Sequence, residues 1–412
     1  MSYLKGNAVV GQSGGPTAAI NATLSGVIRG ALDAKNDGII NVLYGMKNGI
    51  EGFLREDFVN LFEFFDNEEK LEVLEATPAA ALGSCRRKMR SHTEDAPTYA
   101  KILEIFKKYD IRYFFYIGGN DSMDTVLKLS EYAASHDYEL RVVGVPKTID
   151  NDLEATDHTP GFGSAAKFVA TTVKEILRDI NVYTMNAVTI VEIMGRDAGW
   201  LTASAALAGV SDGIGPDLIY LPETVFDKDS FVRDVNTKLS EHPAVLVAVS
   251  EGVRFSDGRY VGEGTQSGAV DVFGHKYLAG TGKVLEEIVR NEIGCKVRSI
   301  ELSLTQRCAS HIASLTDINE SKMVGMGAVV LALKGKTGVM ATIGRTPGEE
   351  YSSNVGCADI SGIANAIKKV PVEFINDDGN GVTEKCIEYL KPLIIGEIPQ
   401  TYENGLPKHI II

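Results

Sequence analysis

Short apolar runs that end in glycine or a small polar residue recur along this chain and lead into amphipathic stretches. Parallel strands of a βαβ fold have this pattern because helices cover both faces of their sheet. Apolar residues spaced by three and four predict helices, for example over residues 99–109 and 164–180. The predicted strands cover residues 7–10, 113–117, 142–145, 188–193 and 245–249. The pattern therefore predicts an α/β fold with mainly parallel, doubly wound sheets.

The length of the chain indicates more than one folding unit. A chain of 412 residues with 44% hydrophobic content suits two fused Rossmann-like lobes with a cleft between them. We expect a first lobe over residues 1–163, to which the chain returns at about 308–350, and a second lobe over 164–307. Residues 351–412 form a C-terminal extension that carries no readable motif. Ligands of such sheets gather at the carboxyl ends of the strands, so we expect the active site in the cleft.

Charge and composition exclude several classes of protein. The formal net charge of −14 argues against nucleic-acid and acidic-membrane partners, which need a basic face. No apolar stretch approaches the roughly 20 residues that span a bilayer, and the N-terminus lacks the basic flank and length of a signal peptide. The five cysteines are scattered, with no zinc-type spacing. We therefore expect a cytoplasmic protein whose anionic ligands are held by a local cluster of Arg and Lys.

Two glycine-rich turns follow predicted strands and are candidates for binding phosphate. The run GQSGGPT at residues 11–17 opens a helix, where backbone N–H groups and the helix N-terminus favour an anion. The run GGNDS at residues 118–122 adds Asn120 and Asp121, whose oxygens suit Mg²⁺ directly or through water. Each run is also compatible with an ordinary tight turn or helix cap.

A third run, PKTIDND at residues 146–152, follows the strand at 142–145. It combines two carboxylates, an ammonium group and a hydroxyl, which offer a base, a stabiliser of charge and a hydrogen-bond partner for a substrate. A solvated charged loop would rarely stand between an apolar strand and the glycine-rich run TPGFG at residues 159–163. This run is the strongest candidate for a catalytic loop.

These three runs and the sequence Met194-Gly195-Arg196 occur in the order and approximate spacing of the phosphofructokinase family, which the chain resembles from about residue 7 to about residue 325. The resemblance implies phosphoryl transfer to the 1-hydroxyl of fructose 6-phosphate with Mg²⁺ as cofactor. It identifies Asp150 as the general base and Asp152 as a second carboxylate that supports the base and the metal. Arg196 is implied to stabilise the transferring phosphoryl group. The catalytic set that it implies is Asp150, Asp152, Lys147 and Arg196.

The resemblance also implies a sugar site. Glu251 matches a residue that binds sugar hydroxyls, and Arg298 and Arg307 match two arginines that clamp the 6-phosphate, for which planar guanidinium groups are suited. Leu304 and Ala187 stand where many bacterial ATP-dependent members carry His and Arg, so the full set of 6-phosphate ligands stays open. The implied sugar-binding set is Thr148, Ile149, Asp150, Met194, Gly195, Arg196, Glu251, Arg298 and Arg307.

The implied donor site contains two residues that favour pyrophosphate over ATP. ATP-dependent members usually have glycine where Asp121 and Lys147 stand here. A carboxylate at position 121 fills volume and repels the α-phosphate, and the Lys147 ammonium neutralises a pyrophosphate leaving group. Asn120, the implied metal ligand, departs from the Asp that is common in pyrophosphate-dependent members. The implied donor-binding set is Gly14, Gly15, Arg86, Gly119, Asp121, Ser122 and Lys147, with Arg87 and Lys88 as alternatives to Arg86.

Four other classes of protein share some of these features. An ATP-dependent phosphofructokinase is the main alternative, since Lys also occurs at position 147 in some ATP-dependent members. A non-catalytic regulatory subunit would have lost the base, whereas Asp150, Asp152 and Arg196 are present. Kinases of the NAD or lipid type lack the combination of catalytic-loop and Met-Gly-Arg motifs, and a dinucleotide-binding module would need the G-x-G-x-x-G pattern. The family implies a homodimer or homotetramer whose subunits complete each other's sugar site.

Overall fold

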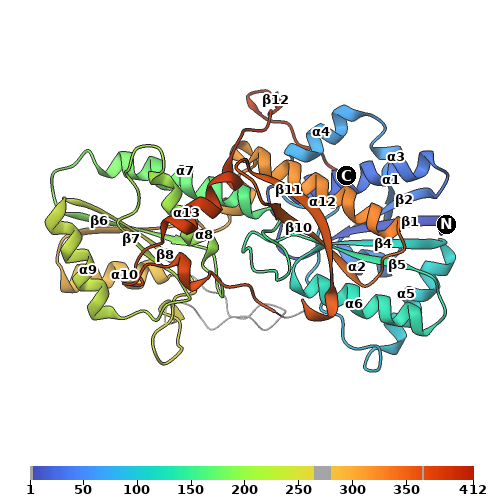
Figure 1. Ribbon diagram of the computed structural model, residues 1–412, viewed down its shortest axis with the longest axis horizontal. Helices are drawn as coiled ribbons and strands as arrows, with labels where there is room; N and C mark the ends of the chain where they lie inside the picture. Colours follow the sequence, from blue (N-terminus) through green and yellow to red (C-terminus); the bar gives the residue numbers. More distant parts are fainter. Residues whose placement is uncertain (1–2, 264–279, 364–365) are drawn as a thin grey trace.

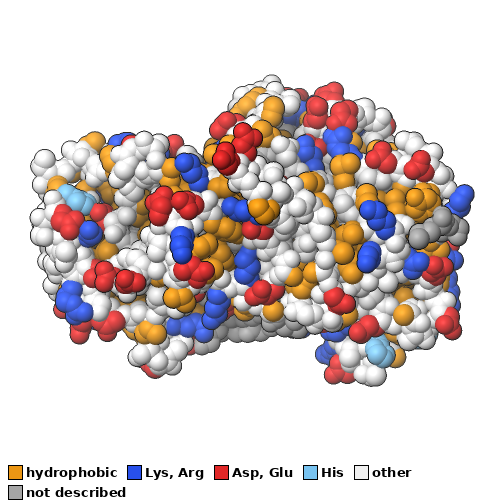
Figure 2. Space-filling view, in the orientation of Figure 1, with side chains coloured by type: hydrophobic (Ala, Val, Ile, Leu, Met, Phe, Trp, Pro, Cys, Tyr) orange, Lys and Arg blue, Asp and Glu red, His pale blue; other side chains and the backbone are white. Residues whose placement is uncertain are grey.

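The computed structural model describes residues 3–263, 280–363 and 366–412 and contains two lobes, each built on its own sheet (Figure 1). We call the lobe with the seven-stranded sheet the first lobe and the lobe with the four-stranded sheet the second lobe. Within the described part of the chain, no helix is long and apolar enough to cross a membrane. Lys and Arg side chains alternate with Asp and Glu side chains over the face drawn in Figure 2.

The first lobe begins with the N-terminal part of the chain. Its elements are β1 (Gly6–Gln12), α1 (Ile20–Asn36), β2 (Ile40–Met46), α2 (Gly49–Leu54), β3 (Phe58–Asn60), α3 (Leu61–Phe64), α4 (Glu68–Ala76), α5 (Ala96–Lys108), β4 (Ile111–Gly118), α6 (Asn120–Ser135) and β5 (Arg141–Pro146). The strand order is β11-β10-β5-β4-β1-β2-β3, and only β3 and β11, at the two ends of the sheet, pair antiparallel to their neighbours. The strand order reverses between β1 and β4, which is where ligands bind in such sheets.

The second lobe follows in the chain. Its elements are α7 (Phe162–Ile180), β6 (Ala187–Ile193), α8 (Trp200–Ala203), the 3-10 helix η1 (Ser204–Gly209), β7 (Leu218–Tyr220), α9 (Lys228–Glu241), β8 (Ala244–Ser250), α10 (Thr281–Glu292) and β9 (Lys296–Glu301). All pairings in the sheet β7-β8-β6-β9 are parallel. Helix α7 forms because its buried residues recur every three or four positions along one face, which packs on this sheet.

The remaining chain crosses between the lobes more than once. Its elements are α11 (Thr305–Cys308), η3 (Ser310–Ile312), α12 (Leu315–Leu333), β10 (Val339–Thr346), β11 (Ser352–Asp359), η4 (Ile360–Gly362), η5 (Val372–Phe374), α13 (Glu384–Leu390), η6 (Lys391–Ile394), β12 (Tyr402–Glu403) and β13 (Leu406–Pro407). Strands β10 and β11 belong to the first sheet, whereas Val370, Cys386 and Leu390 are buried in the core of the second lobe. Ile410 and Ile412 pack against the core of the first lobe again.

Both sheets are covered on both faces, as the apolar runs predict. On β4, Tyr113 and Phe115 face the core beneath α1 and α12, while Phe114 and Tyr116 face the core beneath α5 and α6. Every residue of β8 is buried for the same reason. The five predicted strands and both predicted helices are confirmed, and so is the α/β fold with mainly parallel sheets.

Candidate active site

A cleft of about 760 Å³ lies between the carboxyl ends of the two sheets. Loops after β1, β4 and β5 line it from the first lobe, and loops after β6, β8 and β9 line it from the second. The predicted motif loops therefore meet in one cleft, because the carboxyl ends of parallel strands lie along one edge of each sheet.

The glycine turn after β1 is held by contacts from two other segments. Gly14 has a φ of +76°, a conformation that glycine adopts readily. Its N–H donates to the carbonyl oxygen of Cys85 at 3.1 Å, and its own carbonyl oxygen accepts from Ser84 Oγ at 2.7 Å. Lys147 Nζ donates to the carbonyl oxygen of Gly15 at 2.5 Å. The turn and the lysine after β5 are therefore joined directly.

The turn after β4 has little space for side chains. A Cβ atom on Gly118 would lie 1.9 Å from Ser122 Oγ, so a larger residue cannot replace this glycine without a shift of the turn. Helix α6 begins at Asn120, whose Oδ1 atom is buried and has no hydrogen-bond partner among the described residues. Asp121 lies in the first turn of the helix, and its Oδ1 atom is 3.7 Å from Lys88 Nζ.

The catalytic-loop candidate begins where β5 ends beside β4. The N–H of Lys147 donates to the carbonyl oxygen of Gly118 at 2.9 Å, and burial lowers the pKa of Lys147 to about 8. The N–H of Asp150 donates to Thr148 Oγ1 at 3.1 Å. Burial raises the pKa of Asp150, against the opposing charges of Arg196 and Lys147. Burial and the charge of Asp150 raise the pKa of Asp152. Two carboxylates and a buried lysine thus share one polar site.

In the second lobe, Gly195 stands in a crowded turn after β6. Its φ is +140°, and a Cβ atom there would lie 2.6 Å from the carbonyl oxygen of Ala198. The N–H of Gly195 donates to Glu251 Oε1 at 3.3 Å, and the N–H of Met194 donates to Gln306 Oε1 at 3.2 Å. Burial raises the pKa of Glu251 to about 8. The turn therefore joins the loops that follow β6, β8 and β9.

Nearly all predicted site residues line the cleft. Among the described residues, the lining leaves out only Gly195 and Arg298 of the predicted set. Gly195 lies beside the cleft through its bond to Glu251, whereas Arg298 is exposed on β9. The side chain of Arg307 lies close to Gly15 in the first lobe. A Cβ atom built on that glycine would be 3.3 Å from Arg307 Nη1. Burial lowers the pKa of Arg307. The roles of these residues stay predictions.

The cleft also contains residues that the sequence did not single out as site residues. Glu192, Asp197, Gln306 and Ile367 line it together with the motif residues. Glu192 interrupts an apolar strand and Asp197 directly follows Arg196, and both features were visible in the sequence. Glu192 accepts hydrogen bonds from the N–H groups of Gly280 and Gly282, so it holds the start of α10 against β6. Ile367 comes from the C-terminal extension, where no sequence pattern pointed to the cleft.

The fold and the cleft are those of a two-lobed α/β enzyme that binds anionic ligands at the carboxyl ends of its strands. A family model described as phosphofructokinase matches residues 7–332, so the chain belongs to the phosphofructokinase family. Enzymes of this family generally use a divalent metal ion.

Relatives with similar sequences carry a more specific name. The chain is 41% identical over 408 residues to a pyrophosphate–fructose 6-phosphate 1-phosphotransferase of Methylococcus capsulatus, covering 98% of this chain and 96% of the relative. It is 42% identical over 408 residues to a protein of the same name from Xanthomonas campestris pv. campestris, with the same coverage of both chains. The crystal structure of a pyrophosphate-dependent phosphofructokinase from Nitrosospira multiformis matches with a TM-score of 0.88 and 38% identity, covering 98% of this chain and 96% of that one.

Proposed function

We propose that this protein transfers a phosphoryl group from pyrophosphate to the 1-hydroxyl of fructose 6-phosphate, giving fructose 1,6-bisphosphate and phosphate. The observation that carries the proposal is the meeting of the three motif loops and the Met-Gly-Arg turn in one cleft, which Asp121 and Lys147 both line. The similar relatives that are named for this reaction support it.

Asp150 is the proposed general base. An alcohol is a poor nucleophile until its proton is accepted, and the raised pKa of Asp150 makes its carboxylate a stronger acceptor. In the proposed step, the carboxylate of Asp150 takes the proton of the 1-hydroxyl while the sugar oxygen forms a bond to the terminal phosphorus of pyrophosphate. The bond between that phosphorus and the bridging oxygen breaks, and phosphate leaves. Asp152 is the proposed supporting carboxyl, and burial together with the charge of Asp150 raises its pKa.

The cations of the cleft have separate proposed tasks. Arg196 neutralises charge on the transferring phosphoryl group, because phosphoryl transfer depends mainly on positioning and charge stabilisation. Lys147 lies against Gly15 and neutralises the phosphate that leaves. Arg86 contacts the donor, and Arg307, which is close to Gly15, contacts a phosphate of the sugar. Thr148, Met194 and Glu251 hold the sugar.

Magnesium is the proposed divalent metal of this cleft. The buried Oδ1 atom of Asn120 lacks a partner, and Asp152 lines the same cleft. The described residues contain no group of three or more His, Cys, Asp or Glu side chains that could hold a metal. A site with few protein ligands suits Mg²⁺, which keeps several waters and binds substrate phosphates. When bound, the ion would neutralise charge on the pyrophosphate oxygens.

Initial rates with fructose 6-phosphate, Mg²⁺ and either pyrophosphate or ATP test the function. We expect the wild-type chain to form fructose 1,6-bisphosphate with pyrophosphate at a much higher kcat/KM than with ATP. A preference for ATP would instead support the ATP-dependent alternative. The absence of product with both donors, from a folded protein, would support a regulatory subunit.

Further proposals concern the organisation of the chain. Residues 1–163, with the return at about 308–350, are the proposed donor-binding lobe, and residues 164–307 are the proposed fructose 6-phosphate-binding lobe, to whose site the first lobe adds Thr148, Ile149 and Asp150. The exposed position of Arg298 is compatible with a sugar site that a second subunit completes in a homodimer or homotetramer. The five cysteines are unpaired, which suits a reducing cytoplasm.

A further inference from the structure

Asn151 stands between the two carboxylates of the catalytic loop in an unusual conformation. Its φ is +54°, in the left-handed region that residues other than glycine adopt rarely, and its side chain is fully buried. Its Oδ1 atom accepts a hydrogen bond from the N–H of Thr159 at 3.1 Å. Its Nδ2 atom donates to the hydroxyl of Tyr389 at 3.2 Å. The side-chain amide of Asn151 therefore holds the backbone that carries Asp150 and Asp152.

Tyr389 belongs to α13 in the C-terminal extension and is fixed on several sides. Its hydroxyl donates to the carbonyl oxygen of Asp157 at 2.6 Å. Its ring lies 5.3 Å from the ring of Trp200 and 5.5 Å from that of Phe374, between ring centroids. The guanidinium of Arg345 lies 4.6 Å from the centroid of the same ring. This ring is a rigid support that brings one hydroxyl to the catalytic loop.

A second contact from the extension holds the same loop. The N–H of Lys368 donates to the carbonyl oxygen of Asp152 at 2.9 Å. Its Nζ atom donates to the carbonyl oxygens of Thr156, at 3.1 Å, and Asp157. Its own carbonyl oxygen accepts from Trp200 Nε1 at 3.0 Å. Residues 366–370 thus lie between the catalytic loop and the second lobe.

The extension also reaches the turn that carries Arg196. Glu223 Oε1 accepts from the N–H of Val370 at 3.0 Å and from the N–H of Gly199 at 2.9 Å. Residues 366–370 are therefore bonded directly to the loop of Asp150 and Asp152 and, through the carboxylate of Glu223, to the loop that follows Arg196.

We propose that the C-terminal segment 366–394 positions the catalytic loop, and that Tyr389 is the positioning residue that holds Asn151 and thereby the carboxylates of Asp150 and Asp152. The inference rests on the proposed function. Without the hydroxyl of Tyr389, the Nδ2 atom of Asn151 is a buried donor without its partner. This costs free energy, which a shift of the loop can relieve. Displacements of about 1 Å at a reacting group can lower rates about a hundredfold.

The test replaces Tyr389 by phenylalanine, which removes the hydroxyl and keeps the ring. We expect kcat with pyrophosphate to fall about 10- to 100-fold while KM for both substrates stays within about threefold, because the loop is misplaced and the phosphate ligands are not. The melting temperature should fall by no more than about 5 °C. Tyr402→Phe is the matched control, since Tyr402 is exposed on the β12–β13 hairpin of the same extension, and it should leave all values unchanged.

Asn151→Gly tests the same contact from the other side. Glycine adopts the left-handed conformation without strain but removes both side-chain hydrogen bonds. We expect a loss of kcat at least as large as that of Tyr389→Phe. The kcat of the double variant should lie within about threefold of that of Asn151→Gly alone, because both changes remove the same hydrogen bond between Asn151 and Tyr389.

Three results would overturn the inference. They are a kcat of Tyr389→Phe within twofold of wild type, a rise in KM at unchanged kcat, and full activity of Asn151→Gly. If Tyr389→Phe does not fold, the result for Asn151→Gly decides. Failure of the proposed function has a different signature, since the wild-type chain itself would then lack activity with pyrophosphate.

Discussion

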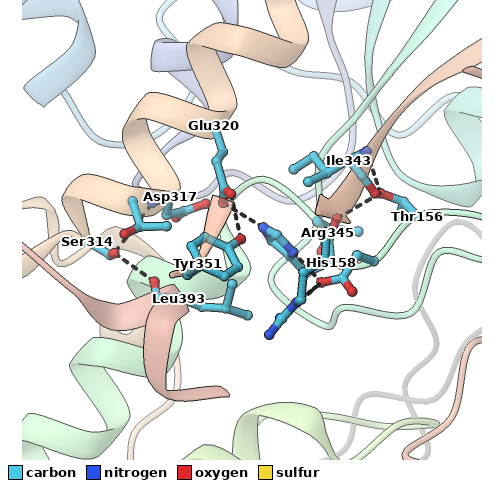
Figure 3. A network of polar contacts seen from close by, with 12 residues as sticks. Thr156, His158, Ser314, Asp317, Glu320, Ile343, Arg345, Tyr351 and Leu393 are labelled. Atoms are coloured by element: carbon cyan, nitrogen blue, oxygen red, sulfur yellow. Dashed lines mark hydrogen bonds and ion pairs between the residues drawn. The ribbon is translucent and has the colours of Figure 1, made fainter. Parts of the chain in front are cut away.

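The Nε2 atom of His158 lies 2.6 Å from Oε2 of Glu320 on α12, and its Nδ1 atom lies 2.8 Å from Oδ1 of Asp157 (Figure 3). The imidazole is almost fully buried, with 1% of its side chain exposed. Burial lowers the pKa of His158, but the two carboxylates outweigh it and leave the pKa raised. The imidazole therefore joins the loop after Asp150 and Asp152 to α12, in a setting that favours its protonated form.

Other charged and titratable groups complete this network. The hydroxyl of Tyr351 donates to Glu320 Oε1 at 2.6 Å, and Arg345 Nη2 donates to Asp157 Oδ1 at 3.1 Å. Lys368 donates to the backbone of Asp157. The pKa values of Asp157 and Glu320 are lowered, since the bonds to His158 outweigh the effect of burial. All three pKa shifts favour the charged forms of Asp157, His158 and Glu320.

Replacing His158 by glutamine should lower the free energy of unfolding by about 3 kcal/mol near pH 6, because the buried Glu320 loses its cation and the partly buried Asp157 is left with Arg345. The loss should depend on pH. A raised pKa in the folded state gives stability that is fully present below the unfolded value of about 6.5 and is lost as the pH rises through the folded value. Denaturant unfolding at pH values from 6 to 9 measures it.

The exposed His311 provides the control for this experiment. His311→Gln should leave the unfolding free energy nearly unchanged at every pH. A difference between wild type and His158→Gln that is the same at pH 6 and pH 9 would contradict a protonated imidazole.

Asp150→Ala should lower kcat with pyrophosphate by at least about a hundredfold, the usual scale of a lost general base. KM for fructose 6-phosphate should change much less, because the other proposed sugar ligands remain. Steady-state kinetics at saturating Mg²⁺ measure both quantities. Turnover comparable to wild type would remove Asp150 from the role of base.

Two residues of α1, Ser25 and Arg29, predict that the enzyme is not strongly controlled by effectors. The family resemblance implies effector-binding arginines on this helix in bacterial ATP-dependent members, and here Arg29 remains whereas Ser25 stands at one of those positions. Arg29 is already paired with Glu68 and with Glu75, the latter at 3.0 Å, and Ser25 Oγ donates to Glu75 at 2.8 Å. We expect hyperbolic saturation with fructose 6-phosphate and little response to ADP or phosphoenolpyruvate. Sigmoidal curves that ADP relieves would be the opposite result.

The parts of the site that could be predicted are those that follow strands. The apolar runs located β1, β4, β5, β6 and β8, and the polar residues after them had to share one edge of each sheet. Tyr389 was beyond prediction, because it lies 238 residues from Asn151 and their contact depends on how the extension crosses between the lobes. The pairing of His158 with Glu320 spans 162 residues and was hidden for the same reason.

Asp121 and Lys147 are the two residues that we expect to select between pyrophosphate and ATP. Asp121 lines the cleft from the first turn of α6, and its only ion-pair partner within 4 Å in the described part of the chain is Lys88, at 3.7 Å. Lys147 lines the same cleft and donates a hydrogen bond to the carbonyl oxygen of Gly15. A carboxylate that is only loosely paired repels an α-phosphate, while the ammonium favours a phosphate leaving group.

Asp121→Gly should therefore open volume and remove repulsion, so that ATP begins to act as donor while the use of pyrophosphate falls. Removing one like charge should change the ratio of kcat/KM for ATP to that for pyrophosphate by about 10- to 1000-fold. Adding Lys147→Gly should deepen the loss with pyrophosphate, because the leaving phosphate then lacks its cation. Changes within one site are seldom additive, so both single variants and the double variant are measured at fixed sugar and Mg²⁺. A wild-type preference for ATP, or a donor ratio that Asp121→Gly leaves unchanged, would show that these two residues do not select the donor.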